Sequence, residues 1–333
     1  GDAFLADNYI LALAPGVTFE IKEANDFTID DVVIVYTGTT HAPELEVRSD
    51  GTLLTKDTDY SLSIVSGVNA GEDVRVTVVG KGDYLGAQEK VFTIAPAVIT
   101  ITPDAKTKVY GAVDPELTYA DVTAVVEGET PAFTGALGRE EGETVGTYAF
   151  TLGTLALTDG DGDNAFLAAN YTLTLAEYDE PAVAPAFAIT AKSLAGDTLT
   201  IGAIASRAYT GLEQMPTPVV KDGATTLIKD TDYALTYADN TNVGTATAKV
   251  IVTGKGNYSG TKEKTFTITP VTITVTADAG QSKTIAAADP TLTYTATGAV
   301  NGETPAFAGA LTREEGETVG TYAITQGTLA LAN

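Results

Sequence analysis

Residues 128–149 read GETPAFTGALGREEGETVGTYA, and residues 302–323 repeat them as GETPAFAGALTREEGETVGTYA. Only two of the 22 positions differ, and the offset is 302 − 128 = 174 residues. A second pair keeps the same offset, because GKGDYLG at 80–86 returns as GKGNYSG at 254–260. A fixed period of this kind indicates an array of repeated modules in place of one large domain.

Each period contains two unlike modules. The A modules, residues 23–95 and 191–269, share YTG, KDTDY, GKG followed by Asp-Tyr or Asn-Tyr, and a closing FTI strand. The B modules, residues 96–190 and 270–333, open with VITITP or VTITVT and carry the long GETPAF segment. Residues 1–22 are interpreted as the C-terminal strands of a permuted B module.

The two ends of the chain complement each other. GDAFLADNYILAL at 1–13 matches GDNAFLAANYTLTL at 162–175, and the B module at 270–333 lacks this piece. The chain therefore reads as a circularly permuted window of a longer periodic array. Two interpretations are open: a longer covalent polypeptide, or separate chains joined head to tail by strand complementation, since an unfinished module leaves an open sheet edge.

Apolar residues alternate with polar ones at a period of two, which predicts strands with one buried face. The positions expected to face inward are Val74, Val76, Val78, Ala97, Ile99, Ile101, Ala248, Val250, Val252, Val271, Ile273 and Val275. Further strands are expected at 147–157 and 170–176, and a short helix near 25–32. The predicted fold class is all-β: a tandem array of small β-sandwich or β-grasp-like modules. One proline at 96 or 270 separates A from B, which predicts stiff junctions and an elongated rod.

Composition excludes several partners. The chain carries 44 acidic and 19 basic residues, so its net charge is −25, which repels nucleic acid and anionic lipid. It has no cysteine, and its apolar runs are shorter than the roughly 20 residues of a membrane helix. Neither nucleic acid binding nor membrane insertion is expected.

The B and A modules each resemble a known type of repeat. KVYGAVDPELTY at 108–119, followed by GTYA and NYTLTL, resembles the MBG-type domain of bacterial surface proteins. YTG, a DY before a strand, GKGNY and a Phe-x-Ile strand make the A modules similar to bacterial Ig-like surface repeats. The second B module departs from the pattern, since SKTIAAADPTLTY at 282–294 lacks the Tyr-Gly pair. These resemblances imply an adhesin or stalk on the bacterial cell surface, with no catalytic residues.

One loop has the composition of a cation site. Asp159, Asp161 and Asp163 alternate with glycine and precede Asn164, so their oxygens could converge on calcium. The loop lacks the glutamate that calcium loops place at their twelfth position, and the competing interpretation is a solvated turn. No cofactor is required, and calcium is the one candidate.

Other charged motifs are interpreted as structural. In KDTDY, at 56–60 and 229–233, the aspartates are expected to bind backbone amides in a turn and the tyrosine to begin a strand. REEGE, at 139–143 and 313–317, is interpreted as a solvated hairpin turn. The single histidine, His41, is expected in a surface loop and offers no partners for a triad or zinc site.

These observations predict a non-enzymatic structural repeat region, extracellular and on the bacterial surface, that acts as a stiff spacer or fibre in a stalk, adhesin or filament. Its partners would be neighbouring copies of the repeat, covalent or head to tail, with a host or cell-surface ligand elsewhere in the full protein. Two alternatives are a self-assembling filament subunit and a glycan- or protein-binding adhesive module.

Overall fold

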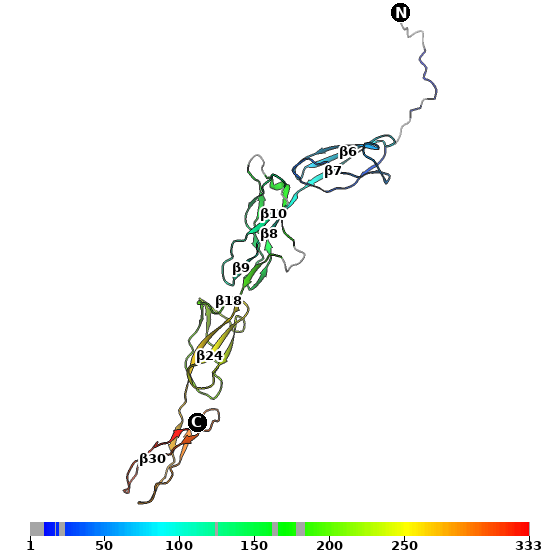
Figure 1. Ribbon diagram of the computed structural model, residues 1–333. Helices are drawn as coiled ribbons and strands as arrows, with labels where there is room; N and C mark the ends of the chain where they lie inside the picture. Colours follow the sequence, from blue (N-terminus) through cyan, green and yellow to red (C-terminus); the bar gives the residue numbers. More distant parts are fainter. Residues whose placement is uncertain are drawn as a thin grey trace. The chain divides into compact units, whose positions relative to one another are not determined.

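The computed structural model describes residues 10–16, 18–19, 24–123, 126–161, 166–177 and 184–332 (Figure 1). The chain divides into two compact units, one of residues 1–106, 116–141 and 148–187, the other of residues 107–115, 142–147 and 188–333. Within the described residues no α-helix occurs, which confirms the all-β prediction. The helix expected near 25–32 is wrong: residues 27–29 form a strand whose first and last side chains are buried.

The first A module folds as two small sheets, of order β2-β7-β6-β5 and β1-β3-β4. Its strands are β1 (Phe27–Ile29), β2 (Ile34–Val35), β3 (Val47–Ser49), β4 (Thr52–Leu53), β5 (Tyr60–Ser66), β6 (Asp73–Gly80) and β7 (Ala87–Ala95). Alternation in β6 buries Val74, Val76 and Val78 completely, as predicted, against Val47 of the smaller sheet. The burial of apolar side chains between the two sheets forms the module's core.

In the first B module, the described strands are β8 (Ala97–Pro103), β9 (Lys106–Val109), β10 (Tyr119–Thr123), β11 (Ala132–Thr134), β12 (Gly138–Arg139), β13 (Gly146–Tyr148), β14 (Phe150–Thr151), β15 (Ala156–Thr158) and β16 (Tyr171–Leu175). A 3₁₀-helix, η2 (Ala168–Asn170), leads into β16. β8 is the central strand of its sheet: β10 pairs with one edge antiparallel and β16 with the other edge parallel. The strand expected over 147–157 is broken into β13, β14 and β15, with Gly153 at a φ of 59° between the last two.

The second A module repeats the first, with sheets of order β20-β26-β24-β23 and β19-β21-β22. Its strands are β18 (Lys192–Ser193), β19 (Leu199–Ile201), β20 (Arg207–Ala208), β21 (Val220–Asp222), β22 (Thr225–Thr226), β23 (Tyr233–Ala238), β24 (Gly244–Gly254), β25 (Tyr258–Ser259) and β26 (Thr261–Thr269). The preceding strand, β17 (Phe187–Thr190), belongs to the first B module, in a sheet of order β13-β17-β9. KDTDY recurs after 173 residues but GKG after 174, so this copy has one extra residue between them. A register shift between Gly244 and Ala248, where Ala246 has a φ of 55°, accommodates it as a bulge.

The second B module contains three hairpins, β27–β28, β29–β32 and β30–β31. Their strands are β27 (Thr274–Ala277), β28 (Tyr294–Thr297), β29 (Phe307–Ala308), β30 (Thr312–Arg313), β31 (Ile324–Thr325) and β32 (Ala330–Leu331). They correspond to β8–β10, β11–β15 and β12–β14 of the first copy. Among the described residues, β27 has no partner corresponding to β16. The four-module division stays a prediction, because the compact units cut through the first B module.

Candidate functional site

The junction between the first A and B modules is part of one hydrophobic core. Pro96 alone separates β7 from β8, and the N–H of Tyr36 donates to the carbonyl of Ala95 at 2.9 Å. A single buried cluster contains β6 and β7 residues of the A module together with Ala97, Ile99, Phe166 and Tyr171 of the B module. Bending at this junction would expose apolar surface, so the burial opposes it.

Two tyrosines from different modules share one carboxylate at this junction. Tyr36, from the YTG motif, and Tyr171, which begins β16, both donate their hydroxyls to Glu129, the latter at 2.9 Å. The Tyr171 hydroxyl also accepts the N–H of Val126 at 3.1 Å. The two rings meet edge to face, with centroids 5.4 Å apart. We call Tyr36, Glu129 and Tyr171 the tyrosine–glutamate clasp.

An asparagine and a glycine complete the junction. Asn170, 1 % exposed, accepts the N–H of Ala70 at 2.8 Å and donates to the side chain of Asn69 at 3.1 Å. Gly38 of YTG has a φ of 78°, and a Cβ there would lie 2.8 Å from the Val126 side chain. Glycine therefore permits both the turn and the close approach of the two modules.

The junction between the second A and B modules has only part of the tyrosine–glutamate clasp. The Tyr209 hydroxyl donates to Glu303 at 2.5 Å, and the Asn301 side chain donates to the carbonyl of Gly211 at 3.1 Å. Tyr209 and Glu303 correspond to Tyr36 and Glu129. Glu303 is exposed, while Glu129 is half-buried.

The tyrosine–glutamate clasp predicts that the first unit loses folding stability at alkaline pH. Burial, and then the Glu129 carboxylate, raise the pKa of Tyr36 to about 12, and burial is the main cause that raises the pKa of Tyr171 to about 12. Both pKa values exceed the ordinary 10.0 of an unfolded chain. The two protonated tyrosines therefore contribute their full stabilisation of the fold below pH 10, and this contribution is lost as the pH rises toward about 12. Titration of ring-labelled tyrosines by NMR should show the hydroxyls of Tyr36 and Tyr171 ionising at a higher pH than an ordinary tyrosine does.

Glu129→Gln removes the negative charge beside both hydroxyls and should lower the pKa of both tyrosines. Glu303→Gln is the matched control and should leave them unchanged. Ionisation of Tyr36 and Tyr171 at the ordinary tyrosine pKa would contradict the clasp.

The proposed calcium loop is only partly described. Asp163 and Asn164 lie outside the described residues. Asp159 accepts the N–H of Ala168 at 2.9 Å, and so ties the start of the loop to the residues before β16. Neither Asp159 nor Asp161 belongs to a cluster of three or more potential metal ligands within the described residues. Calcium binding by this loop stays a prediction.

The KDTDY interpretation is confirmed for the second aspartate and the tyrosine of each copy. Asp59 accepts the N–H of Thr55 and Asp232 accepts the N–H of Ile228, each at 2.7 Å. In the same turns Asp57 and Asp230 have φ of 66° and 71°. Their tyrosines begin β5 and β23, as expected. The carboxylates of Asp59 and Asp232 thus close the turns, whereas the carboxylate of Asp230 pairs with Lys229 at 2.9 Å.

His41 lies in the loop between β2 and β3 and is half-buried. Its backbone N–H donates to the Ser66 hydroxyl at 2.9 Å, and its buried Nε2 has no hydrogen-bond partner among the described residues. The loop assignment is therefore confirmed, although the side chain is less exposed than a surface residue would be.

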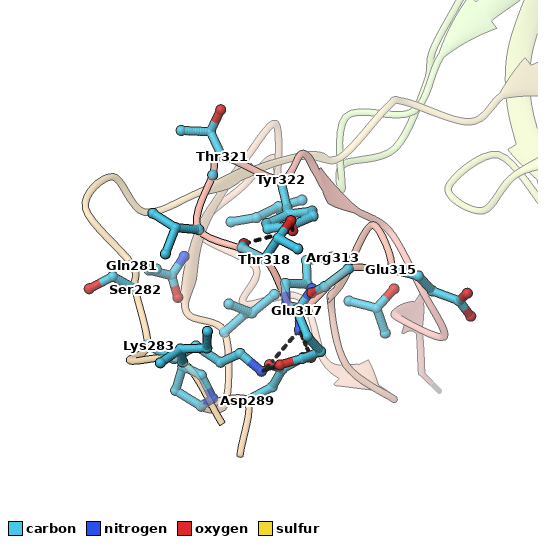
Figure 2. A pocket seen from close by; sticks show the side chains of 18 of the residues that line it. Gln281, Ser282, Lys283, Asp289, Arg313, Glu315, Glu317, Thr318, Thr321 and Tyr322 are labelled. Carbon is cyan, nitrogen blue, oxygen red and sulfur yellow. Dashed lines mark hydrogen bonds and ion pairs between the residues drawn. The ribbon is translucent and has the colours of Figure 1, made fainter. Parts of the chain in front are cut away.

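The second B module holds an open cavity of about 820 Å³. Figure 2 shows Lys283, Asp289, Arg313 and Glu317 lying together against it. Lys283 lies 2.7 Å from Asp289 and 2.9 Å from Glu317, and Arg313 lies 2.9 Å and 2.7 Å from the same two carboxylates. The Arg313 guanidinium also stacks on the Tyr322 ring, 5.1 Å from its centroid. We call the four charged residues the four-charge cluster.

The four-charge cluster corrects the interpretation of REEGE as a purely solvated turn. Hydrogen bonds from the two cations lower the pKa of Asp289 and Glu317, while those carboxylates raise the pKa of Lys283 and Arg313. Each carboxylate is thus held ionised by two cations, and neither is poised as a proton donor near neutral pH. The cluster can position backbone and aromatic groups, and its groups are not tuned for acid–base chemistry.

Sequence reasoning missed both the clasp and the four-charge cluster. A signal for each is present: Tyr36 and Glu129 recur together as Tyr209 and Glu303, and Lys-x₅-Asp at 108–114 recurs at 283–289. In the first copy, Lys108 likewise bonds Asp114 and Glu143, each at 2.5 Å.

Comparison with known protein families supports the resemblance of the B modules to the MBG domain. Residues 99–179 and 273–333 match the profile of the MBG domain, YGX type. The two matched segments lie in the two B modules, on either side of the second A module, and together cover less than half of the chain. No curated protein was found that matches the chain. The described part of the chain holds no helix with the length and apolar character of a membrane span.

Proposed function

We propose that this chain is a structural repeat region of an extracellular bacterial surface protein, a stiff spacer in a stalk, adhesin or filament, without catalysis. The observation that carries the proposal is the continuous core across the first A–B junction, which contains Val78 and Ile94 on one side and Ile99 and Tyr171 on the other. A spacer must keep the modules that it joins in a fixed orientation, and a junction with a buried apolar core resists bending.

The chemistry of the described residues supports this function over an adhesive or catalytic one. Most of the recurring tyrosines pack inward: Tyr36, Tyr60, Tyr171, Tyr233 and Tyr258 are at most 7 % exposed, while Tyr84 and Tyr209 are half-buried. An aromatic platform for sugars would instead present such rings to solvent. The net charge of −25 keeps neighbouring stalks apart by repulsion.

The proposal extends to location and to the A modules. Tandem MBG-type domains support a place on the bacterial cell surface, and the resemblance of the A modules to Ig-like surface repeats supports the same location. A narrow distance distribution between spin labels on the first A and B modules would support the stiff junction. A broad distribution would contradict it.

A further inference from the structure

Pairs of parallel strands join the two ends of individual modules. β8 pairs with β16 in the first B module, and β2 pairs with β7 in the first A module. The second A module has two such pairs, β18–β25 and β20–β26. In each pair one strand lies early in its module and the other lies late. Because parallel partners run in the same direction, the chain enters the early strand at one end of the pair and leaves the late strand at the other end.

This arrangement determines how a pull along the chain acts on the hydrogen bonds. Tension draws the early strand toward its N-terminus and the late strand toward its C-terminus, so two parallel neighbours must slide past each other. All the hydrogen bonds between them then share the force and must break together. Antiparallel neighbours pulled from the same end would instead separate one hydrogen bond at a time, since each bond breaks before the next is strained.

The β8–β16 pair is the longest of these and is shielded from water. Residues Tyr171–Leu175 lie opposite Ala97–Ile101 in unbroken register. The pairing continues beyond them, because the N–H of Ala176 donates to the carbonyl of Ile101 at 2.9 Å. Ile99 and Ile101 are fully buried, so water has little access to this face of the ladder, and hydrogen bonds are stronger where the local dielectric is low.

The first B module ends in β17, which is strained in the same direction. The N–H of Lys106 donates to the carbonyl of Ala186 at 3.3 Å, and the N–H of Tyr110 donates to the carbonyl of Thr190 at 2.8 Å. Both segments advance by four residues between these two bonds, so β9 and β17, which are neighbours in one sheet, are parallel as well. A pull on the end of β17 therefore also slides it along β9.

Both A modules have the same contact at their exit. The N–H of Tyr36 donates to the carbonyl of Ala95, and the N–H of Tyr209 donates to the carbonyl of Thr269, each at 2.9 Å. Each carbonyl belongs to the last residue of the closing strand, directly before the proline that leads into a B module. The YTG motif thus fastens the point at which the chain leaves each A module.

We propose that these parallel pairs are mechanical clamps, through which the modules withstand tension along the chain, with the β8–β16 pair as the strongest. This function goes beyond stiffness, because a stiff junction opposes bending whereas a clamp raises the barrier to unfolding under force. That the chain experiences tension rests on the proposed function, since a surface stalk is pulled when its tip is held. The clamps themselves rest on strand pairing alone.

Pulling the β8–β16 pair in two directions tests the clamp in the full chain, which has no cysteine of its own. Val98→Cys with Glu177→Cys places handles at the start of β8 and just beyond the end of β16, so force slides the strands past each other. Val98→Cys with Thr172→Cys is the matched control, because these two residues lie opposite each other and force on them peels the strands apart. All three side chains are exposed, so no buried contact is removed.

Optical tweezers at one loading rate measure the rupture force of each double variant. The sliding variant should rupture at a force at least about twofold higher than the peeling variant, because five residue pairs share the force in one case and a single bond bears it in the other. Equal forces, or a higher force for peeling, would overturn the clamp.

The result is separable from the proposed function. Equal rupture forces together with a rigid A–B junction would overturn the clamp alone and leave the stiff spacer in place. A higher sliding force together with a flexible junction would support the clamp and contradict the stiff spacer.

Discussion

Replacing Tyr171 with alanine is expected to lower the free energy of unfolding of the first unit by about 3–5 kcal/mol. Tyr171 is 6 % exposed, stacks on Phe166 at 4.9 Å and joins Tyr36 and Glu129 in the clasp. Its removal leaves a cavity where two modules share one core. Hydrogen exchange of the intact chain, read on peptides from β6, β7 and β8, measures this loss of protection.

Tyr171→Phe is the matched control for the clasp itself. It keeps the ring and removes only the hydroxyl that bonds Glu129 and Val126. An unsatisfied buried partner costs about 1–3 kcal/mol, so this variant should lie between the wild type and Tyr171→Ala. If Tyr171→Ala lost no protection in the A-module strands, the two modules would not share a core.

Ile99→Ala and Ile273→Ala should have very different effects although they change equivalent positions. Ile99 is fully buried in the central strand β8, so its truncation is expected to cost about 2–5 kcal/mol. Ile273 is only half-buried, and the same change should cost only about 1 kcal/mol. Hydrogen exchange of each B module in the full chain measures both.

Equal costs at the two positions would mean that the second B module buries its strand face as well as the first does. Such a result would contradict the half-buried position of Ile273.

Local alternation was enough to predict the cores of the A modules. Val74, Val76 and Val78, and their counterparts Ala248, Val250 and Val252, are all fully buried, since a period of two places them on one face of a strand. The turns at Asp59 and Asp232 could also be predicted, because a short side chain bonds backbone within a few residues.

The clasp and the four-charge cluster could not be predicted this way, because their members come from distant parts of the chain. Tyr36 and Glu129 are 93 residues apart, and Lys283 and Glu317 are 34 apart. The local sequence of REEGE predicts a solvated turn, because Lys283 approaches this motif only in the folded module. The half-buried state of Ile273 likewise depends on long-range pairing, because among the described residues β27 pairs with β28 alone.

The rigidity of the first A–B junction is the central claim, and spin-label distances measure it most directly. Ser63→Cys on β5 and Thr134→Cys on β11 place labels at exposed positions of the two modules in an otherwise cysteine-free chain. Ser63→Cys with Ala87→Cys, both within the first A module, gives the width expected of a rigid body. We predict a distribution across the junction as narrow as this control, which broadens in Tyr171→Ala. A broad distribution in the otherwise unaltered chain would contradict the stiff spacer.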